Sequence, residues 1–113
     1  MCNNKDNAMN KVIDIVVDCC ATDLGNGQKS LTRDDVLGKR KDENICMTRT
    51  ILVNQLLWAG FTVSTVSALL HRTPQAIRRI NAQNTSYIAS SRAYRIALSE
   101  ATIRCKDIEP GGV

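Results

Sequence analysis

The sequence predicts an all-α fold, a compact bundle of about six helices that contains a helix-turn-helix. Apolar residues recur at the three- and four-residue spacing of helices, and no segment alternates with period two as a strand would. The breaks between the periodic segments carry residues that start and end helices. With 113 residues, the chain has the length of a single domain. We expect this domain over residues 7–105, between short tails at residues 1–6 and 106–113.

Two helices are expected in the first third of the chain. Over residues 7–21, apolar side chains recur at helical spacing, with Asp14 and Asp18 on the opposite face. A stretch with two glycines then interrupts the pattern. A short second helix is expected after Thr32, which can cap it, and should end near Gly38.

A longer third helix is expected over residues 45–59, which carry an apolar stripe. Gly60 stands where a helix ends in the left-handed conformation, and Phe61 is expected to fold back onto that helix. Because Trp58 and Phe61 flank this turn, we expect both side chains in the core.

Three more helices complete the expected bundle. Thr62 can cap a helix over residues 63–70. Thr73 and Pro74 open the next helix, because a residue before proline avoids the helical region and proline favours the first helical position. The last helix is expected over residues 91–105.

The fourth and fifth of these helices match a helix-turn-helix. The first helix of such a motif carries apolar residues and a small one where the two helices cross, a pattern that Val66, Ser67 and Leu70 fit. Ile77 and Ile80 would pack the second helix against the first. The second helix is therefore expected to run at least to residue 80. The alternative is a helical hairpin that only packs.

The opposite face of the second helix would enter a major groove of DNA. Gln75, Arg78 and Arg79 lie on that face and are the expected base-reading residues. Arg72 and Thr73, at the helix start, are expected to bind phosphate. The turn has His71 where glycine is usual and Arg72 where an apolar residue is usual, and both departures favour the hairpin that only packs.

The charge distribution favours a polyanionic partner. Net charge is +4, but residues 44–99 contain no aspartate or glutamate and no lysine. The basic residues of this interval are Arg49, Arg72, Arg78, Arg79, Arg92 and Arg95. An acid-free surface with guanidinium groups suits phosphates, although a solvated basic surface with no partner is the alternative.

The segment LTRDDVLGKRKDENICMTRTILVNQLL, residues 31–57, resembles the C-terminal DNA-binding domain of the bacterial replication initiator DnaA. Members of that family show a "ved-L-lskkR…v-aRqiamyL" pattern after an amphipathic helix. Residues 34–37 match its short helix, 39–41 its basic loop and 47–49 the start of its long helix. The helix order agrees over residues 10–105, and about 30 residues match well.

The resemblance implies a helix-turn-helix fold of the Trp-repressor-like group, whose basic loop and first arginine of the long helix approach the DNA backbone and minor groove. By that resemblance, the further phosphate-binding residues expected here are Lys39, Arg40, Lys41 and Arg49. The family's recognition stretch GGRDHTTV is replaced by LHRTPQAI, so we expect a target sequence of its own. Without room for the family's ATPase domain, the chain is expected to be a stand-alone DNA-binding module.

We expect no catalytic, metal or cofactor site. His71 is the only histidine, which leaves no His-rich metal site and no paired acid–base system. Five cysteines without a CxxC pair indicate reduced thiols in a cytoplasmic protein, and Cys19 and Cys20 lie on or beside the buried stripe of the first helix. No apolar run is long enough to span a membrane.

The sequence therefore predicts a duplex-DNA-binding protein without catalysis, either a transcriptional regulator or an accessory of replication or of a mobile element. Scarce aromatic residues favour double-stranded over single-stranded DNA. The alternative is a helical adaptor that binds an acidic protein partner. A homodimer is left open, since nothing in the sequence resembles a zipper.

Overall fold

Six helices make up the structure, a computed structural model that describes residues 4–23, 33–39, 42–106 and 108. They are α1 (Asn4–Asp23), α2 (Arg33–Leu37), α3 (Glu43–Trp58), α4 (Val63–Leu70), α5 (Pro74–Ser90) and α6 (Arg92–Cys105). The described residues contain no strand. The all-α prediction is therefore confirmed. Helix α1 begins at Asn4, so residues 4–6 of the expected N-terminal tail are helical instead. Residues 1–3, most of the expected C-terminal tail, the Thr32 cap and the two glycines before it lie outside the described residues.

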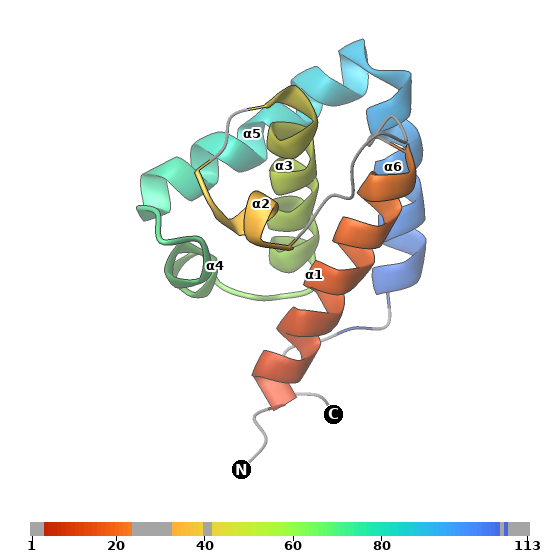
Figure 1. Cartoon of the computed structure of the whole chain (residues 1–113). Coiled ribbons are helices and arrows are strands. Elements are labelled where there is room, and N and C mark those ends of the chain that lie inside the picture. Colours follow the sequence, from red (N-terminus) through yellow and green to blue (C-terminus); the bar gives the residue numbers. More distant parts are fainter. Residues whose placement is uncertain (1–3, 24–32, 40–41, 107, 109–113) are drawn as a thin grey trace.

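Helix α3 stands at the centre of the bundle (Figure 1). Helix α4 lies on one side of it, α1 and α6 lie against each other on the other side, and the short α2 lies in front. Helix α5 starts beside α4 and crosses α3 to reach α6. A radius of gyration of 13.1 Å is the value expected for one globular domain of this length.

The central place of α3 explains its burial, which goes beyond the expected stripe. Ile51, Leu52, Val53 and Leu56 are fully buried, and polar side chains of the same helix are buried as well. Thr48 and Thr50 satisfy their hydroxyls by donating to the carbonyls of the preceding turn, at 2.7 and 3.0 Å. Because α3 has neighbours on several sides, its burial extends beyond the one face that its apolar stripe predicts.

The turn after α3 has the expected geometry with one correction. Gly60 has a φ of 108°, and the Phe61 N–H donates to the Leu56 carbonyl at 3.0 Å, as in a Schellman motif. Phe61 is buried as expected, but Trp58 is 58 % exposed. Trp58 is the last residue of α3, beyond the buried part of that helix, so the prediction that it lies in the core was wrong.

Helix α5 continues ten residues beyond Ile80 and ends against α6. Ser91 separates the two helices, and its hydroxyl accepts a hydrogen bond from the Tyr94 N–H at 3.1 Å. The buried Tyr94 hydroxyl donates to Asn84 on α5 at 2.5 Å, and its ring lies 5.1 Å from that of Tyr87. These contacts hold α5 in a fixed direction relative to the bundle.

Candidate nucleic-acid interface

The turn between α4 and α5 is formed by residues 71–73. The His71 N–H donates to the Ala68 carbonyl at 3.4 Å, and the Arg72 N–H donates to the Ser67 carbonyl at 3.1 Å. This is a second Schellman motif, and His71 occupies its left-handed position with φ 54° and ψ 46°. His71 therefore adopts the conformation for which glycine is usual in this turn.

Helices α4 and α5 are locked by the residues expected to lock them. Val66, Leu70 and Ile77 are fully buried, and Ile80 is half-buried. Ser67 is half-buried, and its hydroxyl donates to the Arg72 carbonyl, so it ties α4 to the turn as well as keeping the helices close.

The start of α5 is capped as the sequence predicts. The Thr73 hydroxyl accepts a hydrogen bond from the Ala76 N–H at 3.1 Å, and Pro74 is the first helical residue. Thr73 is exposed, and so are the three expected base-reading residues Gln75, Arg78 and Arg79. The outer face of α5 is therefore accessible along its first three turns.

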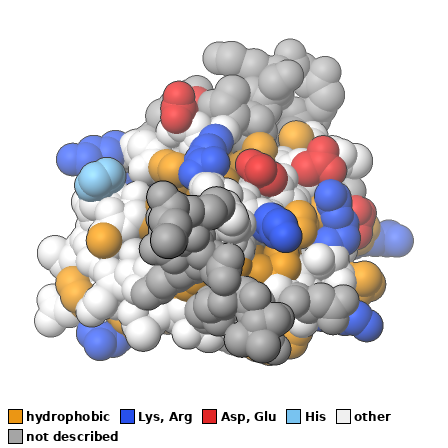
Figure 2. Space-filling model, turned by 90° about the horizontal axis from the view of Figure 1, so that it is seen from below, with side chains coloured by type: hydrophobic (Ala, Val, Ile, Leu, Met, Phe, Trp, Pro, Cys, Tyr) orange, Lys and Arg blue, Asp and Glu red, His pale blue; other side chains and the backbone are white. Residues whose placement is uncertain are grey.

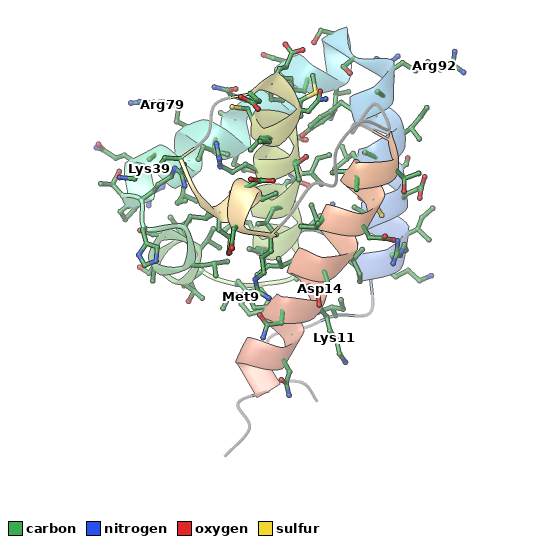
Figure 3. The ribbon with its side chains drawn as sticks, in the orientation of Figure 1. Met9, Lys11, Asp14, Lys39, Arg79 and Arg92 are labelled. Atoms are coloured by element: carbon green, nitrogen blue, oxygen red, sulfur yellow. The ribbon has the colours of Figure 1, made fainter. Side chains whose placement is uncertain are left out.

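One pocket lies beside this face, between α5, the N-terminal half of α3 and the end of α2. Its volume is about 440 Å³. It is lined by Lys39, Cys46, Arg49, Arg72, Ala76, Arg79 and Ile80. Four of these seven residues are basic and none is acidic. We call it the basic pocket. Lys39 and Arg79 lie on the same side of the molecule, far from Arg92 (Figure 3).

The surface around the turn agrees with this charge pattern. In the space-filling view, the pale blue His71 lies at one edge beside basic side chains, and no acidic side chain adjoins it (Figure 2).

Arg49 lies at the floor of the basic pocket rather than at its mouth. It is only 5 % exposed, and its guanidinium donates to the Val36 carbonyl at 2.9 Å and to the Gly38 carbonyl at 3.0 Å. These carbonyls belong to the end of α2, which the arginine therefore caps. This placement differs from the expectation that Arg49 faces a DNA phosphate.

Arg72 reaches the same carbonyl from the opposite side. Its guanidinium donates to the Gly38 carbonyl at 2.8 Å and to the Leu70 carbonyl at 3.1 Å. Burial, together with the neighbouring Arg49 guanidinium, lowers the pKa of Arg72. Arg72 and Arg49 thus join the turn between α4 and α5 to the end of α2, and Arg72 reaches Gly38 across 34 residues of sequence.

The sequence missed this junction, although it carried one signal. An arginine at residue 72, where the motif has an apolar residue, indicates a side chain with a specific partner, and that partner is Gly38. Of the expected phosphate-binding residues, Lys39 is exposed at the pocket. Arg40 and Lys41 lie outside the described residues.

The cysteines of the described chain lie mostly in the core. Cys19, Cys20 and Cys105 are buried, and burial raises the pKa of Cys105 to about 11 and that of Cys19 above its ordinary value. Both thiols are therefore protonated at neutral pH. Within the described part of the chain, no cluster of three or more His, Cys, Asp or Glu side chains could hold a metal ion.

No described helix is long and apolar enough to cross a membrane. No family model, no curated protein and no solved structure matches the chain.

Proposed function

We propose that this protein binds duplex DNA through α5, without catalysis. The observation that carries the proposal is the exposed outer face of α5 beside a pocket that is lined by basic residues and by no acid. A groove-inserted helix needs an accessible polar face, rigid support and surroundings that do not repel phosphates. The buried locking residues and the Schellman turn supply the support.

Different residues are proposed to read bases and to contact the backbone. Gln75 and Arg78 lie outside the basic pocket and are the proposed base readers, by bidentate bonds to adenine and guanine worth about 1–3 kcal/mol each. Lys39 and Thr73 are proposed to contact phosphates, as expected from the sequence, since Lys39 lines the pocket and Thr73 caps the helix start. Arg79, expected from the sequence to read bases, also lines the pocket and is instead proposed to contact a phosphate.

The test is a titration of fluorescent random-sequence duplexes with the full chain, between about 50 and 200 mM salt. Binding should weaken log-linearly with salt, with a slope of about 0.9 per phosphate contacted. Selection from a pool of random duplexes then supplies the preferred site. A chain that binds no duplex at the lowest salt would refute the proposal.

Paired variants separate the two roles. Arg78→Ala should reduce the preference for the selected site over a scrambled one, by about 1–3 kcal/mol at one base position. Lys39→Ala should weaken both duplexes alike and lower the salt slope by about one contact. Equal effects of the two variants on preference and slope would show that the roles are not divided in this way.

A second candidate function is an adaptor that binds an acidic protein partner. Exposed apolar side chains favour it: Trp58 and Ile103 are 58 % and 68 % exposed, and Ile96 is 44 % exposed. Protein interfaces use such residues, whereas groove recognition does not need them. The duplex titration separates the two functions. A DNA-binding protein binds the duplex with an affinity that falls log-linearly with salt, whereas the adaptor shows no such duplex binding.

A further inference from the structure

The basic pocket gathers cationic groups from four separate elements. Lys39 follows α2, Arg49 comes from α3, Arg72 from the turn and Arg79 from α5. Four basic groups on separate elements can be brought together only by the fold. Like charges held close together destabilise a protein unless an opposite charge compensates them.

Two of these groups are fixed in place. Arg72 and Arg49 both donate to the Gly38 carbonyl, at 2.8 and 3.0 Å, so their guanidinium groups lie side by side. The burial of Arg72 and the proximity of Arg49 both disfavour its charge, as the lowered pKa of Arg72 indicates. Among the described residues, Arg72 has backbone carbonyls as acceptors and no carboxylate partner.

Arg72 lines the pocket and has donors beyond those used by its two hydrogen bonds. A guanidinium carries five N–H donors, and the two hydrogen bonds of Arg72 leave others unused. Lys39 and Arg79 are exposed at the mouth, where each can move to meet a ligand. Ala76 and Ile80 give the pocket an apolar wall, which lowers the local dielectric and strengthens charge-assisted hydrogen bonds.

We propose that the basic pocket is a binding site for a phosphate group, which Arg72 holds from the interior while Lys39 and Arg79 close over it. A phosphate has a tetrahedral set of acceptor oxygens, which can be shared among donors that converge from several directions. Two sources carry the same chemistry, a phosphodiester of a DNA backbone and a small phosphorylated molecule. The site itself does not depend on which source is used.

Inorganic phosphate is the probe for this site. The full chain, labelled with ¹⁵N, is titrated with phosphate at constant ionic strength, with sodium chloride as the matched control, and the side-chain Nε–H signal of Arg72 is followed by NMR. We expect saturable shifts with phosphate and none with chloride. The Arg79→Ala and Lys39→Ala variants should each bind phosphate about tenfold more weakly.

Two controls keep the result specific. Arg92→Ala removes the same charge from the far side of the molecule and should leave the phosphate affinity unchanged (Figure 3). Arg79 and Lys39 are exposed, so their replacement should not unfold the chain, and the circular dichroism spectrum checks this. Shifts that fail to saturate, or an equal loss with Arg92→Ala, would overturn the proposal.

A competition experiment separates the two sources of phosphate. If added duplex displaces inorganic phosphate from the pocket, the natural ligand is a backbone phosphate; if it does not, the ligand is a small phosphorylated molecule. Phosphate binding without duplex binding would refute the proposed function and leave the pocket assignment standing. Duplex binding without phosphate binding would overturn the pocket assignment and leave the proposed function standing.

Discussion

His71 carries the most unusual backbone conformation among the described residues that are not glycine. Its φ of 54° lies in the left-handed region, which costs an L-residue about 1–2 kcal/mol. Histidine tolerates this region better than most residues but not as well as glycine. The turn between α4 and α5 is therefore imposed by the packing of these helices and not by the local preference of residue 71.

We expect His71→Gly to increase the free energy of unfolding by up to about 1 kcal/mol. The gain is the relief of the left-handed backbone, reduced by the extra freedom of glycine in the unfolded chain. Urea denaturation measures it. The matched control is Gly60→Ala, which puts a side chain at φ 108° and should destabilise by a similar or larger amount. A loss of stability in His71→Gly would show that the imidazole makes a contact that outweighs the strain.

Ionisation of Cys105 should lower the free energy of unfolding at alkaline pH. Burial raises its pKa to about 11 from the ordinary value of 9.0. A group whose pKa is higher in the folded state contributes stability that is present below the unfolded pKa and is lost as the pH rises to the folded pKa. We therefore expect the free energy of unfolding to fall by roughly 2–3 kcal/mol between pH 9 and 11.

Urea denaturation at a series of pH values measures this fall, and Cys105→Ala is the control. Removing the thiol should flatten the decline over that range, while Cys19 and Tyr94, whose pKa values burial also raises, leave part of it. An unchanged slope in Cys105→Ala would mean that other groups account for the whole effect.

At the scale of the helix, Arg49 has a structural task that can be measured. It caps the end of α2 by donating to the Val36 and Gly38 carbonyls. Arg49→Met keeps the aliphatic stem and removes these bonds, so we expect a loss of roughly 2–3 kcal/mol. Hydrogen exchange should accelerate most at the amides of α2.

Arg92→Met is the matched control, since Arg92 is exposed and its loss should change stability by no more than about 0.5 kcal/mol. If Arg49→Met leaves exchange in α2 unaltered, the arginine is not what holds that helix to α3.

Local signals were enough to predict where α4 and α5 begin and where α3 ends, but not where α1 begins or where α5 ends. The Thr62 and Thr73 caps, Pro74 at the helix start and the left-handed Gly60 each depend on neighbouring residues, and all four are found in the structure. The exposure of Trp58 and the capping role of Arg49 depend instead on which helices surround α3. No pattern within α3 carries that information.

At the scale of the whole molecule, part of the candidate site could be predicted from local residues and part depends on how the helices pack. The exposed face of α5 followed from the spacing of its buried residues, because one helix face determines the other. The basic pocket could not be predicted from spacing, because it forms only when Gly38 and Arg72 meet across 34 residues. The sequence gives all the arginines of residues 44–99 the same expected exposure, whereas the fold buries Arg49 and exposes Arg79.

The charge of Arg92 should affect duplex binding even though Arg92 lies away from the proposed binding face. Arg92 starts α6, just after α5 ends roughly 16 Å along its axis from Arg79, and lies well away from Lys39 and Arg79 (Figure 3). At 0.01 M salt the Debye length is about 30 Å, so a duplex bound at the start of α5 interacts with the charge of Arg92. At 0.15 M the Debye length is about 8 Å, and this interaction is screened.

Arg92→Glu should therefore weaken duplex binding at low salt and have no effect at 0.15 M. Arg78→Glu, on the proposed reading face, should weaken binding at both. Anisotropy titrations at the two salt concentrations distinguish these cases, and a loss at 0.15 M for Arg92→Glu would place the DNA along the whole of α5 rather than at its start.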